Sequence, residues 1–483
     1  MTTTGPATSV SRSSVGLRSE RGPVLLGVML GTALVAIDST ILATAVPSIV
    51  ADVGGFTQFP WLFSVYLLAQ AVSTPVYSKL ADQYGRKPLM LLGVGLFVLG
   101  SLLCGFAWGM GSLIVFRAVQ GLGAGAVQPI GMTIIGDIYS VEERAKVQGY
   151  IASVWAISSV VGPTLGGVFS DYLSWRWIFF VNLPLGGLAA WALWRNFSEQ
   201  VERRPHRIDY AGSLLLSLGG ITLLLGLLEG GVRWAWDSPA SISLFAVAIA
   251  SLLVFVAVER RAAEPVLPLW VFGHRVLASA MLGSVVVGVL MLGLSSYVPL
   301  YAQSVLGHGA LVSGLAVAAL TLGWPIAASN AGRLYLSIGF RATMAIGAVV
   351  GIAGTSLLLL IGPDSPLWLV ALPCFVMGLG FGLVVSPSVI AAQSAVDWSN
   401  RAVATGTTMF ARSVGSAVGV AVFGALANGE VKERLGHSAP SLEDLSVGVL
   451  DPAIHTVFAA SAAVAVLLIG AAALMRPPAK VDG

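Results

Sequence analysis

The sequence predicts an all-α membrane protein with about fourteen spanning helices. Of its 483 residues, 56% are hydrophobic and only 10% are Asp, Glu, Lys or Arg, whereas soluble globular proteins carry about 25% charged residues. Apolar stretches recur along the chain at lengths near the roughly 20 residues that cross a bilayer core. Basic residues then alternate in number between the two sides of these stretches, as they do in polytopic membrane proteins.

The chain begins with residues 1–21, which are rich in Ser and Thr, and we expect them to form a disordered cytoplasmic tail. The apolar stretch that follows is too long for a signal peptide, and further spans come after it. The expected spans are 24–47, 60–78, 88–107, 112–136, 148–170, 177–194, 208–228, 240–258, 276–302, 311–330, 342–361, 366–390, 403–428 and 455–475. A second short cytoplasmic tail, 476–483, ends the chain.

The distribution of the 26 Lys and Arg residues tests this assignment. With the N-terminus inside, twenty of the 26 fall in the inner segments. The outer segments hold Arg176, Arg233, Lys432 and Arg434. Because basic residues accumulate on the cytoplasmic side, we expect a multi-pass protein with both termini in the cytoplasm.

Two parts of the chain resemble one another at an offset of about 257 residues, an internal repeat. The matching pairs are Arg144-Ala145-x-x-x-Gly149 with Arg401-Ala402-x-x-x-Gly406, Gly121-Leu122-Gly123-x-Gly125 with Gly378-Leu379-Gly380-x-Gly382, and Leu80 and Gly85 with Leu334 and Gly339. Because the offset covers an even number of spans, the repeats share one orientation. We therefore expect a six-helix bundle over 22–194, a linker with two extra spanning helices over 195–262, and a second six-helix bundle over 263–475.

Three ionisable residues, Asp38, Arg117 and Arg412, lie inside expected spans. A charge at membrane depth is costly, so such residues usually face an aqueous path or each other. From the rise of a helix, Asp38 lies about 12 Å and Arg117 about 8 Å below the outer ends of their spans. We expect the two to approach one another, whereas Arg412 has no acidic neighbour in the sequence.

Asp38 beside Arg117 forms a workable proton-coupling pair. The aspartate stays ionised next to the arginine and takes up a proton when the arginine moves away or the site dries out. The alternative is a static buried ion pair that orders two helices.

The loop 78–88 contains Asp82, Gly85, Arg86 and Lys87. Its basic residues satisfy the positive-inside rule, which is the simplest explanation of them. Asp82 is also placed to cap the following helix and Gly85 to make a tight turn. Together these residues are candidates for a cytoplasmic latch, a gating loop that opens when the two halves move.

A second motif, Gly162-Pro163-x-x-Gly166-Gly167, lies in the fifth span. Proline removes a backbone donor and kinks a helix, and closely spaced small residues let helices approach. The glycines alone are explained by packing, whereas a Gly-Pro pair indicates a definite kink.

A substrate cavity would use amphipathic side chains within the spans. The candidates are Tyr66, Gln70, Gln128, Trp155, Tyr297, Tyr301, Trp324, Phe410 and Arg412. The alternative for most of the aromatic residues is an interfacial belt. We expect no metal site and no cofactor, because the five histidines and two cysteines are scattered.

These motifs resemble those of the major facilitator superfamily, and specifically its fourteen-span drug:proton antiporter family. The similar segments are Asp38 through Pro47, the loop 78–88, Arg117-x-x-Gln120-Gly121-x-Gly123, Gly162-Pro163-x-x-Gly166-Gly167, and Trp175-Arg176-Trp177-x-Phe179 through Asn182-x-Pro184. The resemblance covers residues 22 to 475. Two departures are Ser78, where Gly is usual, and Ala43, where Asn is common. Unlike some relatives that carry cationic drugs, the C-terminal half shows no clear membrane acid.

The resemblance implies export of lipophilic or cationic drugs in exchange for protons by alternating access, with the proton gradient as the energy source. It also implies a bacterial cytoplasmic (inner) membrane location, function as a monomer, and no nucleic-acid partner. One alternative is a dedicated exporter of an endogenous lipid, siderophore or self-made antibiotic. A different class, a membrane-embedded enzyme or receptor, would need clustered acid–base residues or a signalling domain. The sequence shows neither.

Overall fold

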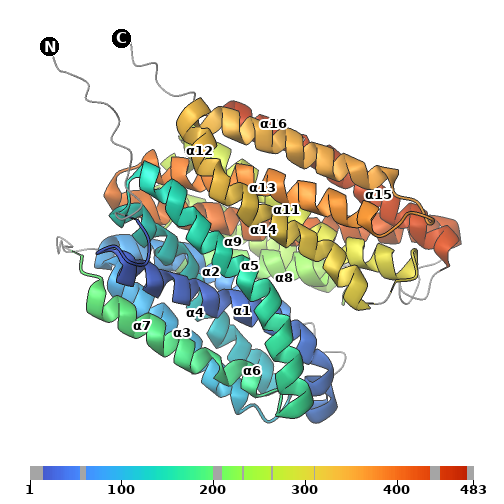
Figure 1. Cartoon of the computed structure of the whole chain (residues 1–483), viewed down its shortest axis with the longest axis horizontal. Coiled ribbons are helices and arrows are strands. Elements are labelled where there is room, and N and C mark those ends of the chain that lie inside the picture. Colours follow the sequence, from blue (N-terminus) through green and yellow to red (C-terminus); the bar gives the residue numbers. More distant parts are fainter. Residues whose placement is uncertain are drawn as a thin grey trace.

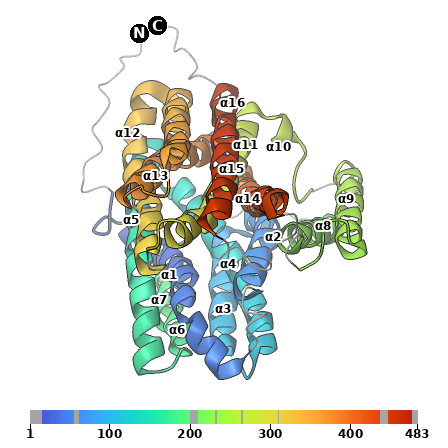
Figure 2. The ribbon, with the colours of Figure 1, turned by 90° about the vertical axis from the view of Figure 1, so that its right-hand side faces the viewer.

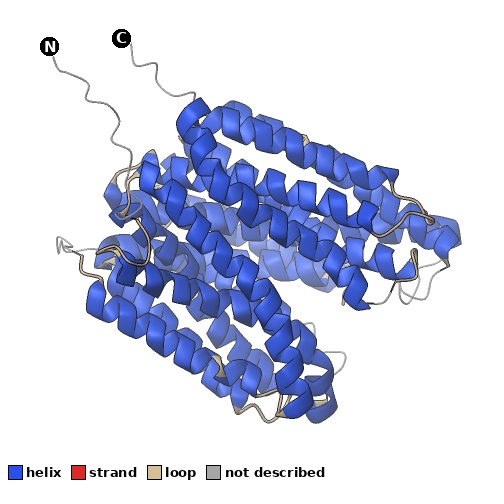
Figure 3. Ribbon diagram, in the orientation of Figure 1, coloured by secondary structure: helices blue, strands red, loops and turns tan. Residues whose placement is uncertain are grey.

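The computed structural model of the chain describes residues 15–54, 61–199, 209–230, 233–262, 265–308, 310–435 and 446–475. These residues form helices joined by short loops (Figure 3). Most of the expected N-terminal tail, the arginines of the linker at 203, 204 and 207, residues 436–445 between the last two expected spans, and the tail 476–483 lie outside this part of the chain.

The first bundle is built from the helices that precede residue 197. They are α1 (Gly22–Val53), α2 (Trp61–Tyr84), α3 (Arg86–Gly105), α4 (Met110–Ile138), α5 (Val141–Tyr172), the short α6 (Trp177–Phe180) and α7 (Asn182–Asn196). The start of α5 shows how the sequence places these boundaries, because Ser140 and Glu143 form a reciprocal capping box there. Helices α1 and α3 both pack against α4 and α7.

The second bundle repeats this arrangement. It contains the short α10 (Trp270–Gly273), α11 (Arg275–Ser304), α12 (Ala310–Leu357), α13 (Trp368–Ser394), α14 (Arg401–Leu435), α15 (Val447–Ala465) and α16 (Leu467–Leu474). Its largest cluster of buried apolar side chains is contributed by α11, α12, α13, α14, α15 and α16. All-helical structure satisfies the backbone polar groups internally, as a bilayer requires.

The two extra helices, α8 (Tyr210–Glu229) and α9 (Pro239–Glu259), are central in the sequence but peripheral in space. They pair with each other, and α8 also packs against α2 and α14 (Figure 2). Each begins at a side-chain cap, Asp209 for α8 and Ser238 for α9. The pair therefore covers the seam between the bundles from one side.

Twelve helical segments of the described residues are long and apolar enough to cross a membrane. One of them, Ala316–Leu360, contains a break at Gly339, where the backbone leaves helical geometry. Helix α2, with 24 residues, is not among the twelve. The expected number of fourteen spans stays a prediction that requires α2 and both parts of α12 to cross.

Glycines of the internal repeat make equivalent contacts in both bundles. Gly123 of α4 faces the backbone of Gly93 and Phe97, and Gly380 of α13 faces the backbone of Gly347 and Gly351. Gly85 and Gly339 both have positive φ, 101° and 83°, a conformation that favours glycine. The repeat read from the sequence is therefore present as two similarly packed bundles.

The two bundles meet at one end and splay apart toward the opposite end, which holds α6 and the start of α15 (Figure 1). We call the closed end the Arg86 end. There α5 contacts α12, with Ala145 against Gly332, and α14 contacts α2, with Gly406 against Ser78. These two contacts are related by the repeat, so each bundle offers the same two surfaces to the other.

We predict that a methyl group at either repeat glycine destabilises its bundle. In Gly123→Ala and Gly380→Ala the new Cβ would meet backbone atoms of the neighbouring helix, and overpacking costs about 1–3 kcal/mol. Gly95→Ala is the control, because nothing lies within 4 Å of a Cβ there. Thermal unfolding of the purified proteins should show lower midpoints for the first two only. Wild-type midpoints in both would contradict the close approach of these helices.

Candidate functional site

Asp38 lies in the core of the first bundle, within a group of polar side chains from four helices and a backbone carbonyl from a fifth. We define the Asp38 cluster as Asp38, Ser101, Arg117, Gln120 and Asn182. These residues come from α1, α3, α4 and α7, and each has a relative exposure of 1% or less. The fifth helix, α2, contributes the carbonyl of Leu62, which accepts from Arg117 Nε at 3.1 Å.

The Asp38 carboxylate accepts three hydrogen bonds. Arg117 Nη1 donates to Oδ2 at 2.7 Å, and Gln120 Nε2 and Asn182 Nδ2 donate to Oδ1 at 2.7 and 3.1 Å. An ionised carboxylate only accepts hydrogen bonds, whereas a protonated one must also donate. Because both oxygens face donors, this geometry fits the ionised form of Asp38.

Arg117 is held from two further sides. Its guanidinium lies 4.2 Å from the ring centre of Tyr66 on α2, a cation–π contact that stabilises a desolvated cation. Its Nη1 also donates to Gln120 Oε1 at 2.7 Å. Gln120 therefore links Arg117 and Asp38 and keeps both in a fixed geometry.

The Asp38 cluster is closed to water in this conformation, since Asp38 and Arg117 are both 1% exposed. The sequence placed both residues in one leaflet, and the structure joins them directly. Their role in proton coupling stays a prediction. A proton can reach Asp38 only after a change in structure that exposes it.

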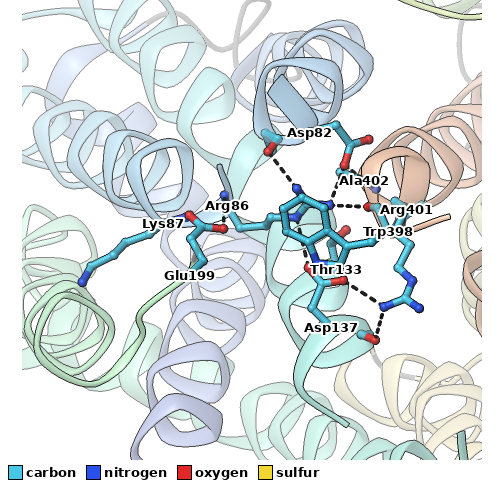
Figure 4. A network of polar contacts seen from close by, with 12 residues as sticks. Asp82, Arg86, Lys87, Thr133, Asp137, Glu199, Trp398, Arg401 and Ala402 are labelled. Carbon is cyan, nitrogen blue, oxygen red and sulfur yellow. Dashed lines mark hydrogen bonds and ion pairs between the residues drawn. The ribbon is translucent and has the colours of Figure 1, made fainter. Parts of the chain in front are cut away.

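A second polar network connects the two bundles at the Arg86 end (Figure 4). We define the Arg86 cluster as Asp82, Arg86, Asp137, Trp398 and Arg401. Arg86 is fully buried and forms ion pairs with Asp82 at 2.7 Å and Asp137 at 3.0 Å. Two carboxylates therefore surround one desolvated guanidinium, which offsets the cost of burying it.

The contacts between the bundles run through this cluster. Arg86 donates to the carbonyl of Trp398 at 2.7 Å, and its guanidinium stacks 3.7 Å above the Trp398 ring centre. Arg401 Nη1 pairs with Asp137 Oδ1 at 3.1 Å. Trp398 and Arg401 belong to the second bundle, so breaking these contacts would release the two bundles from each other at this end.

Asp82 caps a different helix from the one that the sequence predicted. Its carboxylate accepts from the backbone N–H groups of Ala402 and Val403, at 3.2 and 2.9 Å, and so caps α14 of the other bundle. The expectation that Asp82 caps the following helix, α3, is wrong. A carboxylate at a helix N-terminus is favourable, and here this interaction joins the two bundles.

The following helix is capped by Glu199, which sequence reasoning missed. Its two carboxylate oxygens accept from the backbone N–H groups of Arg86 and Lys87 at 2.9 and 2.7 Å. Lys87 Nζ reaches the carbonyl of Trp194 at 2.7 Å. The acidic residue lies 113 positions from Arg86, so no local sequence pattern could have indicated it.

Asp137 was missed for a similar reason. It lies near the end of α4 and looks in the sequence like an ordinary polar residue before a loop. Only packing brings it beside Arg86 and Arg401. Gly85 does make the expected tight turn, with φ of 101°.

The glycines of the motif at 162–167 have different surroundings. A Cβ at Gly162 would collide with Thr40 of α1, two residues beyond Asp38, whereas nothing lies within 4 Å at Gly167. Gly162 therefore lets α5 pack closely on α1 beside the Asp38 cluster, and Gly166 is also buried. The side chain of Pro163 lies outside the described part, so the expected kink stays a prediction.

The residues proposed for a substrate cavity do not form one group. Tyr66 belongs with Arg117 and is 2% exposed, and Tyr301 donates to Asp451 at 2.6 Å. Trp155 is 38% exposed, and Tyr297 is buried within the second bundle. The partly buried members are Gln70, Gln128, Trp324, Phe410 and Arg412.

Trp175 and Arg176 join the start of α6 to the end of α1. The Trp175 indole and the Arg176 guanidinium both donate to Asp52, at 2.9 and 2.7 Å. These two hydrogen bonds, the one from Trp175 first, lower the pKa of Asp52 below its usual range. The pair of Arg176 and Asp52 is thus exposed to solvent, whereas the pair of Arg117 and Asp38 is buried.

Comparisons with known proteins agree with this architecture. A model of the Major Facilitator Superfamily matches residues 28–420. Multidrug resistance protein 3 of Bacillus subtilis (strain 168) is 37% identical over 404 residues, which are 83% of this chain and 78% of that protein. Multidrug transporter protein MdtP of the same organism is 34% identical over 450 residues, covering 93% of this chain and 82% of that protein.

More distant similarities extend the comparison. Efflux pump dotC of Dothistroma septosporum is 32% identical over 444 residues, covering 89% of this chain and 76% of that protein. The crystal structure of the human organic anion transporter MFSD10 (TETRAN) superposes with a TM-score of 0.65 at 16% identity. It covers 94% of this chain and 99% of that one. At this identity the superposition shows a shared fold.

We predict that removing one partner of the buried pair costs more than removing both. Asp38→Asn leaves the guanidinium of Arg117 without a counter-charge, which costs about 3–5 kcal/mol. The double variant Asp38→Asn/Arg117→Gln should recover part of that loss. Thermal unfolding in detergent measures both. Arg176→Gln is the control, since its exposed pair with Asp52 contributes little. A double variant less stable than Asp38→Asn would contradict this account of the pair.

Proposed function

The chain belongs to the Major Facilitator Superfamily, and from this premise we propose a secondary transporter that exchanges protons for exported lipophilic molecules. The chain is a multi-pass membrane transporter of small molecules, and not an enzyme. Its multidrug and efflux-pump relatives support drug efflux as the activity. The observation that carries the proton-coupling part is the buried pair of Asp38 and Arg117.

The exchange follows from competition for the Asp38 carboxylate. In the structure Arg117, Gln120 and Asn182 satisfy it as an anion. A proton arriving from outside would neutralise Asp38 and loosen its attachment to Arg117. The helices that carry the two residues, α1 and α4, then become free to shift relative to one another.

The Arg86 cluster is the second part of the proposed switch, because it joins the two bundles at the Arg86 end. The Arg401–Asp137 ion pair, the hydrogen bond from Arg86 to Trp398 and the cap of α14 hold the bundles closed at the Arg86 end. Helix α4 carries Arg117, Gln120 and Asp137, so a shift of α4 caused by protonation would also move Asp137 away from Arg401. We infer that protonation outside and opening inside are coupled through this one helix.

We place the Arg86 end in the cytoplasm and the splayed end outside. The basic residues of the sequence support this orientation, because the loops at the Arg86 end hold most of them. Both termini are then cytoplasmic, in the cytoplasmic membrane of a bacterium. The conformation described here would be closed toward the cytoplasm.

The driving force is sufficient for a useful gradient. One elementary charge crossing 100 mV yields about 2.3 kcal/mol, and about 1.4 kcal/mol sustains each tenfold concentration ratio. One proton per lipophilic molecule is therefore enough for outward export.

We predict that the double variant Asp38→Asn/Arg117→Gln folds but loses proton coupling. The measurement uses proteoliposomes that contain a pH dye and an exported lipophilic drug. With the wild-type protein, the dye should report proton movement coupled to drug movement. For one proton per neutral molecule, a pH difference of one unit sustains about a tenfold drug gradient. The double variant should sustain none.

Asp52→Asn is the matched control for this measurement. Asp52 lies on the same helix as Asp38, but its side chain is 49% exposed, and we expect unchanged coupling. A panel of lipophilic drugs tested on cells that lack their own pumps identifies the drug to use. Full coupling in the double variant would refute the proposed exchange.

We also predict that a disulfide across the Arg86 end stops transport. A Cβ at Gly149 of α5 would lie 3.5 Å from Cβ of Ser329 on α12, which suits a disulfide. Gly149→Cys/Ser329→Cys, made with Cys104 and Cys374 replaced, should crosslink under oxidation and lose drug export. Reduction should restore it.

The single Gly149→Cys variant under the same oxidation is the control and should keep its activity. If the crosslinked protein exported drug at the uncrosslinked rate, the bundles would not need to separate at this end. The rocking of the two bundles would then be the wrong description of transport.

A further inference from the structure

Arg412 is a charged residue at mid-depth of the second bundle. It follows the start of α14, Arg401, by eleven positions, or about 17 Å along the helix axis. A bilayer core is about 30 Å thick, so Arg412 lies near its centre. Its guanidinium cannot reach either interface from there.

The face of α14 that carries Arg412 approaches the first bundle at its Thr405 end. Thr405, Met409, Arg412 and Ser416 are spaced by three and four residues and therefore share one side of the helix. Thr405 accepts a hydrogen bond at 2.9 Å from Gln393 of α13. Gln393 also donates to the carbonyl of Met132 on α4, in the other bundle.

Burial along this face changes with distance from the Arg86 end. Thr405 is fully buried, whereas Met409, Arg412 and Ser416 are partly exposed. Arg412 is therefore more accessible than Thr405, which lies on the same face nearer the Arg86 end.

Arg412 has no acidic partner among the described residues. Its guanidinium makes no hydrogen bond or ion pair with any residue in these ranges. The described acids between 275 and 475 lie in loops or near helix ends: Asp364, Asp397, Glu430, Glu433 and Asp451. Glu443 and Asp444 lie outside the described residues. Arg117, at membrane depth in the first bundle, is by contrast fully paired. Arg412 is thus a partly exposed cation that no described acid pairs with.

An unpaired cation at this depth favours an anionic ligand. Because the membrane centre is poor in water, an ion there gains strongly from an opposite charge. A guanidinium binds carboxylate, sulfonate or phosphate through two parallel hydrogen bonds. It also repels a cation placed beside it. The local charge thus selects against cationic cargo.

We propose that Arg412 is a specificity-determining residue that binds the acidic group of an amphiphilic, anionic cargo. This inference rests on the proposed export function and narrows its cargo. It replaces the cationic cargo considered from the sequence with lipophilic molecules that carry a carboxylate, sulfonate or phosphate. Gln128 of α4, in the other bundle, lies at a similar depth, nine residues from Asp137, and is also partly exposed.

The test uses two dyes that differ in one group. Rhodamine 110 carries a free carboxylate, and rhodamine 123 is its methyl ester. Equilibrium binding is measured by fluorescence anisotropy on protein in nanodiscs of phosphatidylcholine, which offers no anionic lipid to compete, with empty nanodiscs subtracted. We expect the wild type to bind rhodamine 110 about tenfold more tightly, about 1.4 kcal/mol.

Substitutions then assign this preference to the side chain. Arg412→Gln should lose the tenfold preference by weakening rhodamine 110 binding alone, and Arg412→Lys should retain part of it. Arg341→Gln, which removes an exposed arginine from the same bundle, is the matched control and should behave as the wild type. Unchanged elution on size exclusion and an unchanged unfolding midpoint show that each variant is folded.

Two results would overturn the proposal. One is a wild type that binds the two dyes equally or prefers rhodamine 123. The other is a folded Arg412→Gln variant that keeps the preference for rhodamine 110. Binding needs no proton gradient, so either result leaves the exchange mechanism standing. A failure of gradient-driven export would refute the mechanism without changing the binding result.

Discussion

Asp38 and Arg117 constrain the first bundle because separating them inside a membrane would leave two charges without water or a partner. Their ion pair, at 2.7 Å, draws together side chains from α1, α3, α4 and α7 and a carbonyl of α2. In the proposed exchange, the cost of an unpaired charge would leave two states, an anion bound to Arg117 or a neutral acid free of it. A switch of this kind is what an exchanger of protons requires.

The Arg86 cluster also depends on paired charges, but these charges join the two bundles. There Arg86 holds Asp82 and Asp137 within the first bundle, and the same two carboxylates bind the N-terminus of α14 and Arg401 of the second bundle. Small residues at the same level, such as Gly332 against Ala145, let the helices touch. Close packing and ion pairing therefore act together, and α4 connects this region to Asp38.

Arg86, Arg117 and Arg412 differ in what surrounds them. Arg86 and Arg117 are buried and paired with carboxylates, so they organise the protein itself. Arg412 is partly exposed and pairs with no acid of the described residues. An arginine that the fold leaves unpaired at membrane depth is available to a ligand. For that reason the cargo, rather than the scaffold, is the natural partner of Arg412.

The sequence by itself determined the membrane-spanning helical class, the internal repeat and the positions of Asp38 and Arg117, because hydropathy, glycine spacing and rare membrane charges are local signals. It did not reveal Glu199 or Asp137, and it assigned Asp82 to the wrong helix. It gave Tyr66 only as a candidate for a cavity and did not indicate that this residue packs on Arg117. Those partners are joined by helix packing across large sequence separations, 320 residues for Asp82 and Ala402. Only the tertiary structure, which decides what each helix face meets, could supply them.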